Sequence, residues 1–377
     1  MRDGGAPTDA PKVDSPADTL KALTPARYLA WLYSTDAQKP VLAALLEIEA
    51  EIASGLRPGI EHHVAHARLQ WWSEEATRYA EGVPVHPLAR GLLKARAGAG
   101  AADAGGRPGI AAGSSTSIVA GSSTGIAAVS PAGIVAGSST GIAAASPTGT
   151  VGGASTGTVA ASPTGIAGFV DTAVWDLASA TFETRKELTA YCERWAAAMF
   201  ETAAGAVTGG QPAAVHAAAA DQLAPAKIPG RVAKAATLPS SWKTLGAAIR
   251  EVELLTDLTR DAHIGRIRIP LDELDRARVD ANSLAKLPWP APLVTLLKER
   301  HEALRVIIAS NVAAFTTDEQ VALRGLLVWV ALTWRLSVRA ERALPNGILP
   351  RRYDALADGW QAWRAARHAA AGKLRLD

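Results

Sequence analysis

Two carboxylates four residues apart, Asp257 and Asp261, are the side chains of this sequence best spaced for chemistry. On a helix this spacing places both on one face, and Glu253 extends the acidic stripe by one further turn. Like charges at this spacing destabilise a helix by roughly 0.2–0.5 kcal/mol per pair, so a compensating partner is expected. Because Mg²⁺ binds carboxylate oxygens together with substrate phosphates, a magnesium-bound diphosphate is one candidate for this partner.

Ion pairing is the alternative explanation of the acidic stripe. Three arginines, Arg250, Arg260 and Arg266, are near enough in the sequence to neutralise the acids without any ligand. Short acidic patterns are common by chance, so the spacing taken alone favours this structural explanation.

The segments around the stripe resemble those of a known family. Residues 257–274 read Asp-x-x-x-Asp, three further residues, then Gly-Arg-Ile-x-Ile-Pro-x-Asp-x-Leu. This pattern resembles the second aspartate-rich motif of the squalene/phytoene synthase family, and Leu245-Gly246 fits the same helix upstream. Residues 169–192 resemble the central helix pair of that family, and residues 68–87 resemble an earlier helix. Several matches in the same order are more specific than any one of them.

The resemblance covers residues 28–94 and 169–275 well and the C-terminal part loosely. It implies an isoprenoid-synthase-type helical bundle and a prenyltransferase that joins two prenyl diphosphates head to head, with Mg²⁺ as cofactor. It assigns catalysis and metal binding to Asp257 and Asp261, with Glu253 as a further metal ligand. Substrate binding is expected at four more residues: Tyr191, Arg266, Asp171 and Asp176.

The sequence departs from the family at the first of its two acidic motifs. That motif is expected near residues 53–57, which contain no acid. Glu47 and Glu51 offer a substitute pair, with Glu49 on another helical face, and Phe200 stands where a small residue is expected beside a prenyl tunnel. The sequence thereby resembles a divergent branch that includes the mitochondrial complex I assembly factor with a phytoene-synthase-like domain. The alternative function is therefore a catalytically inactive binding or assembly scaffold.

Apolar spacing predicts an all-α fold. Large apolar residues recur near helical spacing in the first part of the chain, at Leu42, Leu45, Leu46, Ile48 and Ile52. A second helix is predicted to open at Thr317, where a capping residue precedes early acids. We expect a disordered tail at 1–20, N-terminal helices at 21–98, a low-complexity insert at 99–168, and the rest of the helical domain at 169–377.

An octad repeat fills the predicted insert. Residues 108–170 contain no Asp, Glu, Lys or Arg, and isoleucine recurs every eight residues at Ile110, Ile118 and Ile126. One large apolar side chain per octad buries too little surface to offset an ordering cost of about 1–2 kcal/mol per residue. A disordered or weakly extended insertion is therefore expected, and a solenoid is the alternative because fixed periods also mark solenoids.

Composition favours a soluble, cytoplasmic protein. The formal charge of +3 over 377 residues does not indicate a nucleic-acid-binding surface. Cys192 is the single cysteine, so an internal disulfide is excluded. Residues 1–19 lack the basic start and apolar core of a signal peptide, and the apolar run at 326–332 is too short to span a bilayer.

Three other features are weaker candidates for binding. His62 and His66 share a helical face at a spacing that suits Zn²⁺, although a solvated histidine pair is the more common explanation. Trp71 and Trp72 would line an isoprenoid pocket or pack in the core. The basic, aromatic helix at 360–368 would contact anionic lipid or a partner, which makes membrane association an alternative to a solvated tail.

Overall fold

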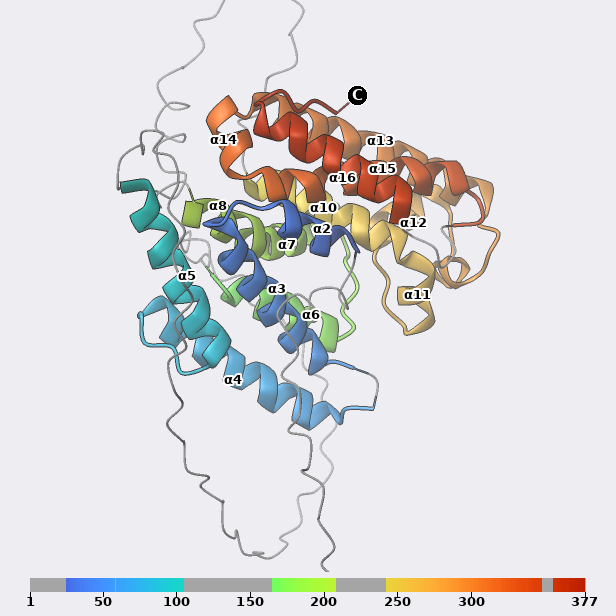
Figure 1. Ribbon diagram of the computed structural model, residues 1–377. Helices are drawn as coiled ribbons and strands as arrows, with labels where there is room; N and C mark the ends of the chain where they lie inside the picture. Colours follow the sequence, from blue (N-terminus) through green and yellow to red (C-terminus); the bar gives the residue numbers. More distant parts are fainter. Residues whose placement is uncertain (1–24, 58, 105–164, 208–241, 348–354, 377) are drawn as a thin grey trace, which may run out of the picture. The chain divides into compact units, whose positions relative to one another are not determined.

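The computed structural model describes residues 25–57, 59–104, 165–207, 242–347 and 355–376 of the chain. Every regular element in these ranges is a helix, and no strand occurs among them (Figure 1). The prediction of an all-α fold is confirmed. The predicted tail at 1–20 and the octad repeats up to residue 164 lie outside the described residues.

The described helices fall into two groups along the sequence. The first group comprises α2 (Pro25–Tyr33), α3 (Gln38–Ser54), α4 (His62–Ala80), α5 (Pro87–Ala104), α6 (Ala167–Leu177), α7 (Arg185–Ala196), the π-helix η1 (Ala197–Glu201) and α8 (Thr202–Val207). The second comprises α10 (Trp242–Thr256), α11 (Leu258–His263), α12 (Leu271–Ala277), the 3-10 helix η2 (Ala281–Ala285), α13 (Ala291–Ala314), α14 (Thr317–Ala322), α15 (Arg324–Ala343) and α16 (Ala355–Ala370).

The helices on both sides of the octad segment belong to one compact unit. Helix α2 packs against α15 and α16, and the Arg324 Nε donates a hydrogen bond to the Tyr33 carbonyl at 2.9 Å. Helix α5 continues to Ala104, past the predicted insert boundary at 98, and α6 begins at Ala167, before the predicted restart at 169. The unit is therefore assembled from segments far apart in the sequence.

Local sequence signals account for the helices that form the core. The predicted apolar stripe of α3 is almost completely buried, at Leu42, Leu45, Leu46, Ile48 and Ile52. Helix α14 begins at Thr317, as predicted, but its cap is Thr316, one residue earlier. The Thr316 hydroxyl accepts a hydrogen bond from the Glu319 backbone, and the Glu319 carboxylate accepts one from the Thr316 backbone, which is a capping box.

Helix α10 lies at the centre and packs against α7, α13 and α15 (Figure 1). Small residues allow this close packing. A Cβ added at Gly246 would lie 2.8 Å from the Cβ of Ala196, and one added at Gly168 would lie 2.1 Å from the Arg194 carbonyl oxygen. The second distance is shorter than any allowed contact with a rigid backbone atom, so α6 can approach α7 this closely only with glycine at this position.

We expect Gly168→Ala to lower the free energy of unfolding by about 1–3 kcal/mol or more, because the added methyl overlaps a backbone oxygen. Gly91 in α5 is the matched control, since no atom lies within 4 Å of a Cβ added there. Gly91→Ala should be neutral or stabilising by about 0.4–1 kcal/mol through the unfolded state. Denaturant titration of both variants measures the difference, and equal effects would contradict the close approach.

His301 is a buried titratable group between α13 and α15. Its side chain is 2% exposed, and its Nδ1 lies 3.0 Å from the Ser337 Oγ. Burial, followed by the positive charge of Arg305, lowers the pKa of His301 from 6.5 to about 4. The imidazole is therefore neutral in the folded protein near neutral pH.

The free energy of unfolding is expected to decrease as the pH falls from 6.5 toward 4. In this window the unfolded chain binds a proton at His301 that the folded chain excludes, so the folded state loses stability. The displaced pKa corresponds to a loss of roughly 3 kcal/mol when the transition is complete. Denaturant titrations across this pH window, on the wild type and on His301→Gln, provide the check. An unchanged dependence on pH in the variant would rule out His301 as its source.

Candidate functional site

A buried arginine joins two acids from different helices at the centre of the predicted site. Arg268 follows α11, and its side chain is 4% exposed. Its Nη2 lies 2.9 Å from the Asp176 Oδ1 of α6, and its Nε lies 2.9 Å from the Asp261 Oδ2 of α11. The Tyr191 hydroxyl of α7 donates to Asp176 at 3.1 Å, and the Arg268 guanidinium carbon lies 5.6 Å from the Tyr191 ring centre. We call these four residues the Arg268 cluster.

The environment fixes the charge states in the Arg268 cluster. Burial raises the pKa of Tyr191, so its phenol stays neutral and can donate to the carboxylate. Burial acts to lower the pKa of Arg268, but the charges of Asp176 and Asp261 outweigh it and raise the pKa. Arg268 is therefore a permanent cation with two carboxylates held against it.

A second cluster lies between α2, α3, α7, α10 and α15. The Arg27 Nη1 lies 2.6 Å from the Glu49 Oε2, and its Nη2 lies 3.4 Å from the Glu253 Oε2. Two indole N–H groups complete the contacts: Trp195 donates to Glu49 at 2.8 Å, and Trp329 donates to Glu253 at 3.2 Å. We call these five residues the Arg27 cluster. Glu49 and Glu253 are therefore each paired with the Arg27 cation and each accept a hydrogen bond from an indole N–H.

Arg250 of α10 connects the two clusters. Its Nη1 lies 3.4 Å from Glu253, and its Nη2 donates to the Tyr191 hydroxyl at 3.3 Å. Its guanidinium carbon also lies 5.1 Å from the Trp195 ring centre, within the range of a cation–π contact. The interior thus contains one continuous polar network that is enclosed by aromatic rings.

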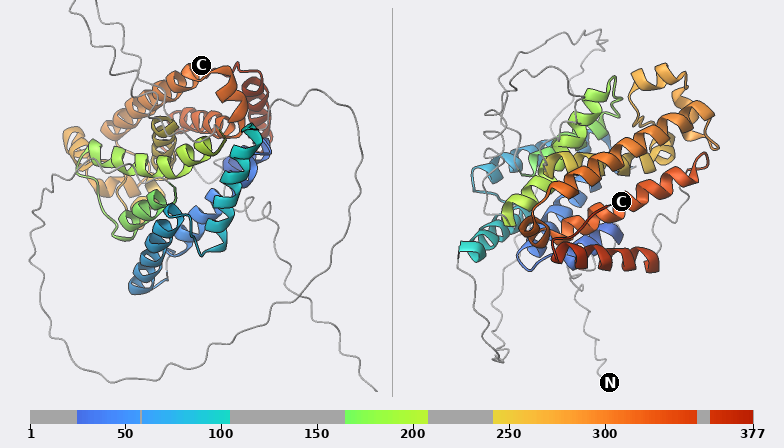
Figure 2. Two further views of the ribbon diagram at one scale, coloured as in Figure 1. Left: turned by 90° about the vertical axis from the view of Figure 1, so that its left-hand side faces the viewer. Right: turned by 90° about the horizontal axis from the view of Figure 1, so that it is seen from above.

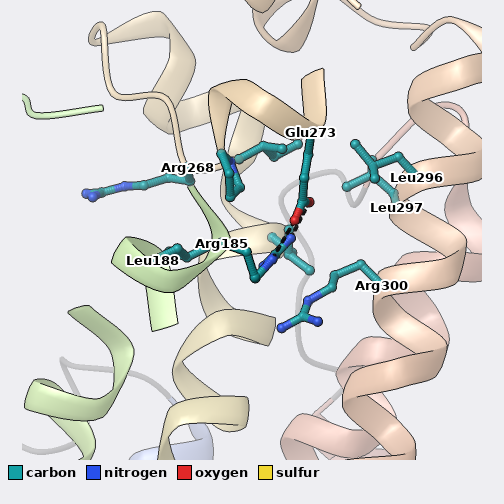
Figure 3. A pocket seen from close by; sticks show the side chains of 10 residues that line it. Arg185, Leu188, Arg268, Glu273, Leu296, Leu297 and Arg300 are labelled. Carbon is teal, nitrogen blue, oxygen red and sulfur yellow. Dashed lines mark hydrogen bonds and ion pairs between the residues drawn. The ribbon is translucent and has the colours of Figure 1, made fainter. Parts of the chain in front are cut away.

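A third group of charges lines a small cavity beside Arg268 (Figure 3). Arg185 of α7 donates to Glu273 of α12 and to Glu251 of α10, and Arg300 of α13 donates to Glu251 at 2.5 Å. Figure 3 shows the Arg185 side chain directed at Glu273, whereas the Arg268 side chain extends away from both. The cavity volume is about 10 Å³. That is about the space one water molecule needs.

The predicted acidic stripe is divided in the structure. Helix α10 ends at Thr256 and α11 begins after Asp257, so the stripe does not lie on one continuous helix. Asp257 pairs with Arg260 at 2.6 Å, Asp261 joins the Arg268 cluster, and Glu253 joins the Arg27 cluster. Within the described parts of the chain, no three His, Cys, Asp or Glu side chains are grouped so that they could hold a metal ion.

Two of the four predicted substrate-binding residues lie together. Asp176 and Tyr191 are hydrogen-bonded in the Arg268 cluster. Asp171 is five residues before Asp176 on α6, about 140° around the helix, and burial raises its pKa, partly offset by Arg194. The backbone N–H of Arg266 donates to the Asp261 carbonyl at 2.9 Å, in the turn that leads to Arg268.

Sequence reasoning missed the residues that complete the network. Among the acids of α3, Glu49 enters the interior, while Glu51 of the predicted substitute pair is exposed and Glu47 is half-buried. Arg27 belongs to no motif. The family resemblance assigned substrate binding to Arg266, which lies two residues before Arg268. One signal for Arg268 was available, because an arginine between two isoleucines just before Pro270 is enclosed by apolar residues.

The comparisons with known proteins agree with this architecture. The model of the family described as squalene/phytoene synthase matches residues 154–353. A solved structure described as a dehydrosqualene synthase in complex with ligand has a TM-score of 0.55 and 13% sequence identity, and the alignment covers 94% of this chain and 93% of that chain. At this identity the structural match concerns the fold alone. A search of curated protein sequences matched none.

We expect Asp261→Asn to be far more destabilising than Asp257→Asn. Removing a carboxylate from the buried Arg268 leaves part of its charge uncompensated, which typically costs about 3–5 kcal/mol. Asp257 pairs with Arg260, whose side chain is 67% exposed, so that pair should contribute less than about 1 kcal/mol because water screens the arginine. Equilibrium unfolding of the two variants tests this contrast. Equal losses of stability would show that Arg268 does not depend on Asp261.

Proposed function

Because the chain belongs to the squalene/phytoene synthase family, we propose that it retains the family fold as a binding scaffold without magnesium-dependent condensation. The observation that carries this proposal is the Arg268 cluster. Asp176 and Asp261, which a substrate or metal would need, are both held by one buried guanidinium.

The residues do not fit Mg²⁺ in this arrangement. Arg268 contacts the Oδ2 atom of Asp261, so a Mg²⁺ ion that took this oxygen would leave Arg268 with one of its two partners. Leaving a buried charge unpaired typically costs about 3–5 kcal/mol, which the metal would have to offset before any net affinity appears. Glu49 of α3 also enters the interior, and its carboxylate is engaged by Arg27 and Trp195.

Aromatic packing supports the same proposal. Trp195, Phe200 and Trp329 are all almost completely buried, and their ring centres lie 5.4–6.0 Å apart. These rings fill space between α7, η1 and α15. A substrate with a long prenyl chain would have to displace them, whereas a scaffold gains stability from their contacts.

A magnesium–diphosphate site on Asp257 and Asp261 is the second candidate. It is favoured by the family match and by the exposure of Arg260, since an exposed arginine can leave Asp257 at little cost. On this candidate the two aspartates would bind Mg²⁺ and a prenyl diphosphate, and Arg268 would stay with Asp176.

A thermal-shift measurement with Mg²⁺ and farnesyl diphosphate separates the two candidates. The scaffold proposal predicts no change in melting temperature and no condensed product. A ligand at about 100 times its dissociation constant would stabilise the fold by about 2.7 kcal/mol, which is several degrees for a domain of this size.

The matched variants are Asp257→Asn and Asp272→Asn. Asp272 is an acid of α12 that, like Asp257, pairs with an exposed arginine, in this case Arg276 at 3.1 Å. A rise in melting temperature that disappears in Asp257→Asn and persists in Asp272→Asn would overturn the scaffold proposal and establish the magnesium–diphosphate site.

A further inference from the structure

Helix α16 carries its large apolar side chains on its exposed side. Leu356 is 88% exposed, Trp360 is 57% exposed and Trp363 is 39% exposed. Their spacing of four and three residues places them along one face of the helix. The two indole rings are stacked, with centres 4.8 Å apart and an interplanar angle of 26°. Figure 2 shows α16, in dark red, at an edge of the helix bundle.

The opposite, buried side of α16 carries only small side chains. Its buried residues are one aspartate and four alanines: Asp358, Ala362, Ala365, Ala366 and Ala369. This side packs against α2, α14 and α15. The helix therefore inverts the usual arrangement, in which large apolar residues are buried. Single exposed apolar residues are common, but a row of adjacent ones marks an interaction surface.

The charges around this row are positive. Arg364 and Arg367 are exposed on α16, and Lys373 and Arg375 are exposed just after it. The Arg367 guanidinium carbon lies 5.5 Å from the Trp363 ring centre, so cation and indole share one patch.

The acids near α16 do not cancel this positive charge. Asp358 is the single acid in residues 355–376, is 1% exposed, and pairs with Arg335 and Arg339 of α15. Helix α14, which packs against α16, contributes Asp318 and Glu319, whose carboxylate is engaged in the capping box with Thr316. The excess of positive charge therefore lies beside the tryptophans.

We propose that this face of α16 binds the surface of an anionic membrane. Tryptophan favours the boundary between acyl chains and headgroups, and Leu356 would enter the apolar side of that boundary. Arginine can keep its charge at the lipid phosphates while its methylene groups lie along apolar surface. None of the helices in the described ranges is long and apolar enough to cross a bilayer, so this is a surface contact. It is independent of the interior network.

Vesicle co-sedimentation of the full chain tests the proposal. Vesicles of phosphatidylcholine mixed with phosphatidylserine should bind the protein, vesicles of phosphatidylcholine alone should bind it much less, and salt should weaken binding. Trp360→Ala combined with Trp363→Ala should lower the partition coefficient at least about tenfold, through lost apolar burial. Arg364→Ala and Arg367→Ala should each lower it about fivefold.

Trp71→Ala is the matched control, because Trp71 of α4 is also 39% exposed and belongs to a separate aromatic group. It should leave vesicle binding unchanged, and melting temperatures verify that every variant is folded. Absence of binding to the anionic vesicles, or an equal loss in Trp71→Ala, would overturn the proposal. So would a tryptophan pair variant that dissociates a dimer in analytical ultracentrifugation without changing vesicle binding, since the face would then bind a second copy of the chain.

Discussion

A guanidinium group in a protein interior must be surrounded by acids. Arg268 is such a group, and the helices at the centre of the fold must place acids beside it. Moving a charge out of water costs several kcal/mol, and the cost is recovered only if hydrogen-bonded carboxylates surround the cation. Asp176 and Asp261 meet this need from α6 and α11, and Tyr191 adds a neutral donor to Asp176. The relative positions of these helices are therefore coupled to one ion-pair geometry. The scaffold proposal follows from the same coupling, because the carboxylate that would bind a metal is also one that neutralises the arginine.

The rest of the interior repeats this pattern around α10. Glu253 is shared by Arg27 and Arg250, and Glu251 is shared by Arg185 and Arg300. One central helix thus supplies acids to cations from α2, α7 and α13. Tryptophan side chains complete the interior. The Trp329 indole N–H donates to Glu253, and the Trp329 and Trp195 rings make cation–π contacts with Arg27 and Arg250. The negative charge of these buried acids is thus neutralised by arginines. Each member of such a network depends on the others, which makes its geometry specific.

The sequence was sufficient for the fold class and the family, and insufficient for the geometry of the site. Apolar spacing gave the buried face of α3 because burial of Leu42 and Leu45 follows from their period. The expectation that Glu253, Asp257 and Asp261 share one helical face was wrong, because it requires a continuous helix. The chain leaves helical geometry at Asp257, which separates Glu253 from Asp261. Glu49 and Arg27 could not be found from spacing, since their meeting depends on how α2 and α3 pack. Tertiary contacts decide which polar residue of a helix turns inward, and no local pattern records them.

The division of charge between interior and surface links the network to α16. Interior arginines are matched by acids, so they contribute little to the field outside the molecule. Asp358 is likewise neutralised by arginines beneath α16, so Arg364 and Arg367 remain uncompensated on the exposed side. On the scaffold proposal, a protein whose interior acids are engaged by its own arginines can still interact through a surface of this kind. The interior ion pairs and the tryptophan-rich basic face of α16 use different residues, so the two features do not compete for the same charges.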